Sequence, residues 1–176
     1  IQTPLQSITD SLGGVIVIAF TVPFLWLFGV HGATIVSSVM NPILLANADS
    51  NSKLVQQGIE LTVENGGRIV TPQFYDLFIN LSGTGITLGL VMYLVAFSKS
   101  KQCREMGKLA FIPSLFNINE PILFGIPIVM NPILAIPFLI MPIISGLMLY
   151  FAQYFGLVPL FVSVILPWTT PPVISG

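Results

Sequence analysis

Long apolar stretches, separated by short charged ones, run through this chain. Residues 11–48 and 77–98 contain no Asp, Glu, Lys or Arg, and the stretch after residue 108 carries a single charge, on Glu120. A helix that crosses the hydrocarbon core of a bilayer needs about 20 apolar residues. The pattern therefore predicts membrane spans at Leu12–Val30 and Leu77–Phe97, with room for two more after Pro121.

These apolar segments are expected to be helices. Backbone polar groups in lipid must form their hydrogen bonds within the protein, and a helix satisfies them inside one segment. Membrane strands would alternate apolar and polar residues, whereas 88–97 reads Leu-Gly-Leu-Val-Met-Tyr-Leu-Val-Ala-Phe and is apolar on every face. The predicted fold class is all-α, a polytopic helical membrane protein.

Prolines mark places where these helices should break. Nine of the fourteen prolines lie in 121–176, and proline removes a backbone donor from a helix. In a membrane such breaks persist where protein or a water-filled cavity satisfies the freed groups, as at transporter binding sites. We expect broken or re-entrant helical hairpins that form the substrate site, with ordinary kinked helices as the alternative. The candidate breaks are Ala33–Ala46, Phe116–Pro127 and Leu166–Pro172.

The composition supports a membrane protein and excludes other classes. Hydrophobic residues make up 54% of the chain and charged residues only 7%, whereas a soluble domain carries about 25% charged residues. A nucleic-acid-binding protein would need a basic surface, but the net charge is −1. The single cysteine, Cys103, excludes a disulfide framework and a multi-cysteine metal site. We expect no metal and no cofactor.

The two charged loops differ in sign and therefore indicate an orientation. Residues 98–108 hold four basic residues and one acid, while residues 49–76 hold two basic residues and four acids. An excess of Lys and Arg marks cytoplasmic loops, which places 98–108 in the cytoplasm. The chain starts at Ile1 without an initiator methionine, and we interpret it as a piece of a larger protein.

Two isolated polar residues are candidates for function. Glu120 lies in an apolar stretch between Asn119 and Pro121, where an unpartnered carboxylate is costly. Proline disfavours helical geometry at the residue before it, so the carboxylate should sit at a helix break. His31 is the only histidine and lies at the end of the first predicted span. The alternatives are structural: a carboxylate that pins a helix end, and a histidine hydrogen-bonded at an interface.

The two tryptophans, Trp26 and Trp168, allow two interpretations. They could form part of an aromatic belt at the membrane interface. They could also stack on sugar rings, because an apolar ring face matches the C–H face of a pyranose while polar groups bind the hydroxyls. With Asn119 and Glu120 they make a set of carbohydrate-binding groups.

The motifs resemble those of a known family. The run Phe116-Asn-Ile-Asn-Glu-Pro-Ile-Leu-Phe-Gly-Ile-Pro-Ile-Val-Met-Asn-Pro132 resembles the signature of membrane enzyme IIC of the bacterial sugar phosphotransferase system, in its lactose/cellobiose/N,N′-diacetylchitobiose branch. Trp26-Leu-Phe-Gly-Val-His-Gly32 and Pro167-Trp-Thr-Thr-Pro-Pro172 look like its companion motifs. The resemblance implies that residues 1–176 are the C-terminal sugar-binding and transport domain, without the N-terminal dimerisation half and the final C-terminal stretch.

The resemblance also implies a function in the bacterial inner membrane. The family imports a disaccharide and phosphorylates it at a C6 hydroxyl, with phosphate from a phosphocysteine on soluble enzyme IIB. The full-length protein would be a homodimer, and the fragment alone would be inactive. Glu120 would accept the hydroxyl proton, and His31 would orient the hydroxyl or stabilise the phosphoryl group. The implied sugar site comprises Trp26, His31, Gly32, Asn119, Glu120 and Trp168.

A second class of function also fits the residues. An ion-coupled secondary sugar transporter would use Glu120 as its coupling site, since an intramembrane carboxylate can bind a proton or a cation. Such a transporter would deliver unmodified sugar.

Overall fold

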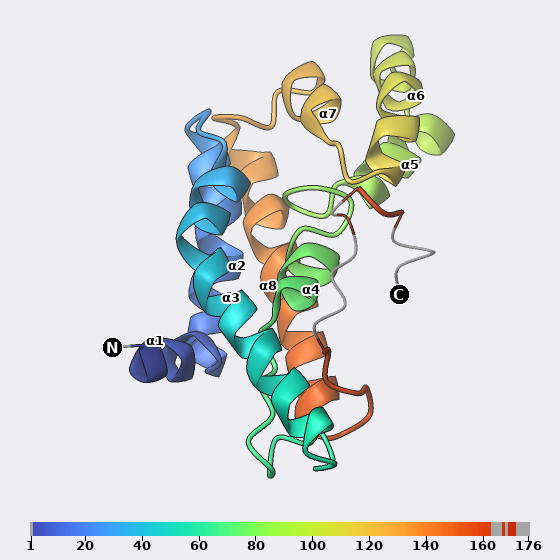
Figure 1. Cartoon of the computed structure of the whole chain (residues 1–176). Helices are drawn as coiled ribbons and strands as arrows, with labels where there is room; N and C mark the ends of the chain where they lie inside the picture. The colour runs from blue at the N-terminus through green and yellow to red at the C-terminus, as the bar shows by residue number, and fades with distance from the viewer. Residues whose placement is uncertain (1, 163–166, 168, 172–176) are drawn as a thin grey trace.

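The computed structural model describes residues 2–162, 167 and 169–171, and every regular element in this part of the chain is helical. This confirms the all-α prediction. Figure 1 shows the arrangement of the elements. They are α1 (Gln2–Thr9), α2 (Leu12–Leu27), α3 (Gly32–Gln56), α4 (Pro72–Phe74), the π-helix η1 (Tyr75–Ile79), α5 (Leu88–Phe97), α6 (Lys101–Leu115), α7 (Glu120–Gly125) and α8 (Pro132–Tyr154).

The three long helices α2, α3 and α8 lie side by side, and α4 packs beside them (Figure 1). Their shared core contains Val15 and Val22 of α2, Leu149 of α8 and Phe74 of α4, all buried. A second unit is formed by α5 and α6, which pack together as a hairpin with α7 against α6. Residues 80–87 connect the first unit to the second, and residues 116–119 connect α6 to α7 within the second unit. Hydrogen bonds between these two segments place them side by side, where a binding site can form.

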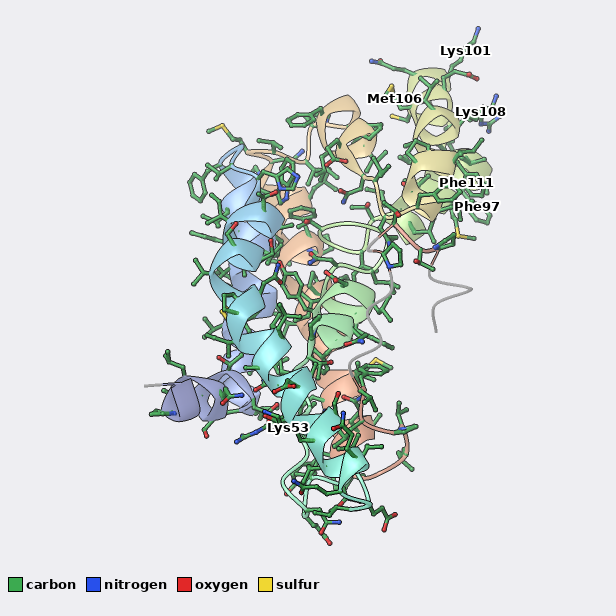
Figure 2. All side chains as sticks on the ribbon, viewed as in Figure 1. Lys53, Phe97, Lys101, Met106, Lys108 and Phe111 are labelled. Atoms are coloured by element: carbon green, nitrogen blue, oxygen red, sulfur yellow. The ribbon has the colours of Figure 1, made fainter. Side chains whose placement is uncertain are left out.

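Helix α8 is the described element that could cross a membrane by length and composition, since it has 23 residues and contains an 18-residue stretch with a mean hydropathy of 2.2. Helices α2 and α5 are apolar but shorter, with 16 and 10 residues. The second span expected after Pro121 does not appear among the described residues. Many large apolar side chains are exposed, including Ile133 and Met148 of α8. Figure 2 shows two others, Phe97 of α5 and Phe111 of α6. An apolar exterior of this kind fits contact with lipid.

The prediction of a single span at Leu77–Phe97 was wrong. The π-helix ends at Ile79, tight turns occupy residues 80–87, and α5 begins only at Leu88. Four residues of these turns have positive φ: Ser82, Gly83, Gly85 and Ile86. Left-handed backbone cannot continue a right-handed helix, so the chain leaves helical geometry although its average hydropathy stays high.

The prediction of a break within Ala33–Ala46 was also wrong. Helix α3 runs through Pro42 for 25 residues. A proline in a helix interior removes one backbone hydrogen bond and kinks or breaks the helix, and here other contacts hold both sides of the proline. Beyond Pro42, the buried side chain of Asn47 donates to Val70 O at 2.7 Å, and that of Asn51 donates to Phe161 O at 2.7 Å. The break predicted at Phe116–Pro127 is confirmed, since α6 ends at Leu115 and α7 is only six residues long. Most of the break predicted at Leu166–Pro172 lies outside the described residues.

Asp10, between α1 and α2, stabilises the segment that precedes α4 through hydrogen bonds to its backbone. Its Oδ1 accepts hydrogen bonds from Ile69 N at 2.8 Å and Val70 N at 2.7 Å, and its Oδ2 lies 3.7 Å from Arg68 Nη1. Burial raises the pKa of Asp10, while these donors act in the opposite direction. Ile69 and Val70 are buried, so their N–H groups depend on this carboxylate.

The substitution Asp10→Ala should loosen this segment. It leaves two buried N–H donors without an acceptor, which costs about 1–3 kcal/mol for each group. Hydrogen exchange of the Ile69 and Val70 amides in the full-length protein should therefore accelerate at least about tenfold. Asp49→Ala is the matched control, because that exposed carboxylate pairs only with Lys53 on the surface. Equal protection in both variants would show that Asp10 does not hold the segment.

Candidate functional site

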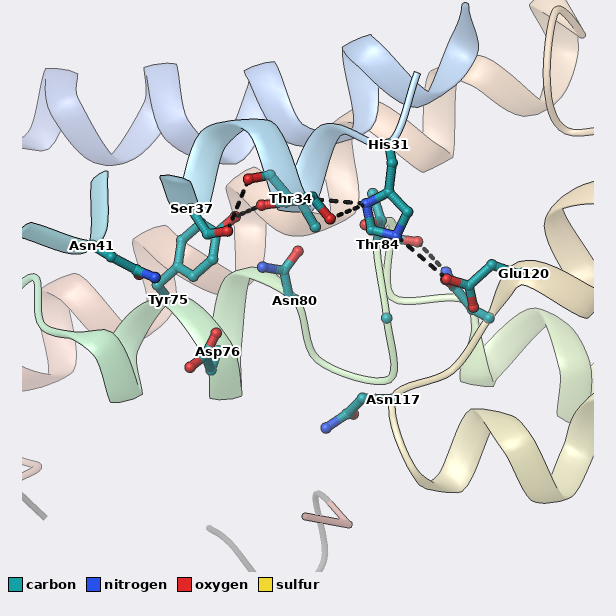
Figure 3. Close-up of a pocket in the computed structure, with 13 residues that line it drawn as sticks. His31, Thr34, Ser37, Asn41, Tyr75, Asp76, Asn80, Thr84, Asn117 and Glu120 are labelled. Atoms are coloured by element: carbon teal, nitrogen blue, oxygen red, sulfur yellow. Dashed lines mark hydrogen bonds and ion pairs between the residues drawn. The ribbon is translucent and has the colours of Figure 1, made fainter. Parts of the chain in front are cut away.

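A cavity of about 390 Å³ opens where α3, η1, the turns at 80–87 and the start of α7 meet (Figure 3). Small-molecule sites usually have volumes of about 300–1,000 Å³. The lining is rich in hydroxyl, amide and carboxylate groups and includes both Glu120 and His31. The structure thus brings together residues that are 89 positions apart in the chain.

His31 is held at the first turn of α3. It caps this helix: its Nδ1 accepts from Thr34 N at 3.3 Å and lies 2.9 Å from Thr34 Oγ1. A backbone N–H can only donate, so Nδ1 is the acceptor. The neutral imidazole must therefore carry its proton on Nε2. That nitrogen faces Glu120 (Figure 3).

Glu120 begins α7, and Pro121 follows it within the first turn. Its Oε1 lies 3.5 Å from His31 Nε2, and the two side chains are 43% and 49% exposed. A contact this long and this accessible contributes little to stability. It leaves one donor and one acceptor open to the cavity, and a hydroxyl group requires both.

Two asparagines join the segment before α7 to the turns at 80–87. Asn119 is buried, and its Nδ2 donates to Thr84 O at 2.6 Å and to Thr87 Oγ1 at 3.2 Å. Asn117 accepts from Ser82 N at 2.7 Å and donates to Thr170 O at 3.1 Å. Asn119 lines the cavity as the sequence suggested, but its amide nitrogen is engaged in holding the turns.

Gly83 makes the close approach of these two segments possible. Its φ is +84°, and a Cβ at this position would lie 2.5 Å from Asn119 Cγ. Only glycine meets both requirements, positive φ and lack of a side chain. The turn and the asparagine therefore fit together as one unit.

Two other predicted site residues, Trp26 and Gly32, do not line the cavity. The Trp26 ring packs against His31 with centroids 4.5 Å apart, and its buried Nε1 has no hydrogen-bond partner among the described residues. Gly32 is buried where a Cβ would run into the carbonyl of Val22. Neither residue is among the described residues that line the cavity. Trp168 lies outside the described residues, so its stacking role, like that of Trp26, stays a prediction.

The wall of the cavity formed by η1 and the turns was not predicted from the sequence. Asp76, Asn80 and Thr84 line it, although Asp76 had been grouped with a charged loop and the other two had been assigned to a membrane span. The run Ser82-Gly-Thr-Gly85 was a usable signal, because glycine clusters favour turns.

Comparison with known proteins decides the family. Residues 2–142 match the family model described as phosphotransferase system, EIIC. The chain belongs to the EIIC family. EIIC proteins are membrane permeases of a sugar phosphotransferase system, which confirms the resemblance in the motifs. This assignment gives no support to an ion-coupled secondary transporter.

Individual EIIC relatives match nearly the whole chain. It is 44% identical to the lichenan permease IIC component of Bacillus subtilis (strain 168), across 99% of this chain and 37% of that protein. It is also 44% identical to the cellobiose-specific EIIC component of Geobacillus stearothermophilus, across 100% of this chain and 38% of that protein. The crystal structure of the transporter ChbC, the IIC component from the N,N′-diacetylchitobiose-specific system, matches with a TM-score of 0.92 and 41% identity. The match covers 100% of this chain and 40% of ChbC. The chain thus spans about two-fifths of the length of these EIIC proteins.

The substitution Gly83→Ala should disturb the EIIC cavity. Positive φ costs a residue with a side chain roughly 1–3 kcal/mol, and the new Cβ would displace Asn119. We expect the full-length protein to lose sugar affinity by about tenfold or more. Gly89→Ala is the matched control, since a Cβ there meets no atom within 4 Å. Unchanged affinity in Gly83→Ala would mean that the turn does not shape the site.

The substitution Thr34→Val should weaken control of the His31 tautomer, because it removes the hydroxyl beside Nδ1 while keeping the backbone donor. The fraction of Nε2–H tautomer should fall, by a shift of about 0.5–1.5 kcal/mol. The readout is ¹⁵N NMR of histidine-labelled full-length protein, with His31 assigned through His31→Gln. Thr34→Ser should restore the wild-type spectrum. A Val variant with an unchanged tautomer ratio would contradict the role of Thr34.

Proposed function

We propose that this chain is the sugar-binding half of an EIIC permease that imports a β-linked disaccharide and presents its C6 hydroxyl to phospho-enzyme IIB. The observation that best supports this proposal is the His31–Glu120 pair in the cavity lining, where His31 Nε2 lies 3.5 Å from Glu120 Oε1. The relatives named for lichenan, cellobiose and N,N′-diacetylchitobiose support a β-linked sugar such as cellobiose, diacetylchitobiose or lactose.

The proposed chemistry uses each group of the pair once. The Glu120 carboxylate accepts the hydroxyl proton while the C6 oxygen attacks the phosphorus of the phosphocysteine. The phosphorus–sulfur bond breaks, and the cysteine of enzyme IIB leaves as a thiolate. The Nε2–H of His31 donates to the reacting hydroxyl or to a phosphoryl oxygen. Phosphoryl transfer depends mainly on position and charge stabilisation, so two well-placed side chains serve it. No metal or cofactor is part of this proposal.

The proposed setting is the bacterial inner membrane, with several crossings and with 98–108 in the cytoplasm. Lys101 and Lys108 project from α6 away from the rest of the chain (Figure 2). A basic surface there would attract the phosphorylated partner. The proposed full-length protein is a homodimer through its N-terminal half, so residues 1–176 alone are expected to be inactive.

The substitution Glu120→Gln tests the proposed function directly. Glutamine keeps the size of the side chain but removes the base, so phosphorylation should fall about 10²–10⁴-fold while disaccharide binding persists. The assay uses membrane vesicles with the full-length protein, phosphoenolpyruvate, the soluble phosphocarriers and a panel of radiolabelled disaccharides.

The matched control is Glu64→Gln, which changes an exposed carboxylate between α3 and α4 that is not among the described residues lining the cavity. It should phosphorylate sugar at the wild-type rate. Wild-type phosphorylation by Glu120→Gln would refute the role of the base. Accumulation of free sugar without phosphoenolpyruvate would refute the whole proposal in favour of ion-coupled transport.

A further inference from the structure

A second carboxylate lines the same cavity, away from the His31–Glu120 pair. Asp76 belongs to η1, and Figure 3 shows it well separated from the pair, with Asn80 between them. The proposed chemistry needs only one carboxylate. The position of Asp76 therefore requires another explanation.

The carboxylate of Asp76 makes no hydrogen bond or ion pair to any described residue. None of the described residues that line the cavity is a Lys or an Arg that could neutralise it, and the nearest basic residue in the sequence, Arg68, pairs with Asp10 instead. A half-buried carboxylate without partners is costly. It persists in a cavity when something that binds there supplies the donors.

Asn80 adds a second free acceptor beside it. The Oδ1 of Asn80 is buried and has no hydrogen-bond partner in the described part of the chain. The backbone N–H of Asn80 bonds to Tyr75 O at 3.1 Å, five residues back, as in a π-helix. This wide turn places Asp76 and Asn80 about one turn apart on the same side of η1, and π-helical turns are frequent at functional sites.

A carboxylate in the cavity lining without a described partner, with an amide side chain also in that lining, matches a ligand rich in hydroxyl donors. An ionised carboxylate can only accept hydrogen bonds, so it favours hydroxyl groups and repels anions. We propose that Asp76, assisted by Asn80, binds the sugar ring that is not phosphorylated and selects neutral glycosides over those with a negative charge on that ring. The inference rests on the proposed function, because it assigns the His31–Glu120 end of the cavity to the ring that reacts.

Equilibrium binding to the full-length protein tests this assignment without any phosphoryl donor. Radiolabelled cellobiose is displaced by unlabelled cellobiose, by glucose, or by a cellobiose derivative whose second ring carries a carboxylate. Asp76→Ala should lower the affinity ratio of cellobiose to glucose roughly 10–100-fold, as expected for lost hydrogen bonds to a charged group. Asp76→Asn, which keeps the shape of the side chain, should raise the affinity for the anionic derivative relative to cellobiose.

The matched control is Asp49→Asn, which removes a carboxylate from the exposed part of α3 outside the cavity. It should leave both ratios unchanged. An unchanged cellobiose-to-glucose ratio in Asp76→Ala would overturn the inference. The inference would also be overturned if the affinity for the anionic derivative relative to cellobiose were the same in Asp76→Asn as in the wild-type protein. Failure of the wild-type protein to phosphorylate sugar would instead overturn the proposed function, because these binding ratios involve no phosphate.

Discussion

The side chains of Asn117 and Asn119 hold the turns at 80–87 against the start of α7, and the arrangement of the site depends on these hydrogen bonds. An irregular segment in an apolar environment must find partners for its backbone groups within the protein. Here Ser82 N and Thr84 O are satisfied by the two amides. Because Glu120 directly follows Asn119, the contacts that satisfy the turns also fix the position of the carboxylate.

Helix α3 connects this site to the opposite end of the molecule. His31 caps its first turn, while Asn47 and Asn51 near its other end bind the backbone of the segment before α4. That segment continues into η1, which returns to the cavity. The same helix thus carries His31 and positions the cavity wall formed by η1, so contacts among several elements, and not one element alone, shape the cavity.

The sequence supported the fold class and singled out His31 and Glu120, which line the cavity, but it did not predict the shape of that cavity. Helices follow from local apolar composition, and a lone histidine and a lone glutamate are conspicuous in such a background. Turns depend on the individual backbone angles of a few residues, which a hydropathy average over 77–97 conceals. The hexapeptide Val-Met-Asn-Pro-Ile-Leu illustrates the limit, since it occurs at 39–44 and at 129–134. Its first copy continues α3, whereas Asn131 of the second caps α8. Tertiary contacts decide between the two outcomes. They explain why the prediction of a helix break at Asn41–Pro42 was wrong and why Asp76 was not predicted to line the cavity.

The cavity draws its polar groups from separate elements: His31 from α3, Glu120 from α7 and Asp76 from η1. This separation has an evolutionary consequence. Under the proposed roles, substitutions in η1 would alter which sugar is accepted while the His31–Glu120 pair, carried by other helices, keeps its geometry. Gene duplication followed by divergence of this five-residue segment would then suffice to produce permeases for different glycosides. The residues proposed to take part in phosphoryl transfer would not have to change.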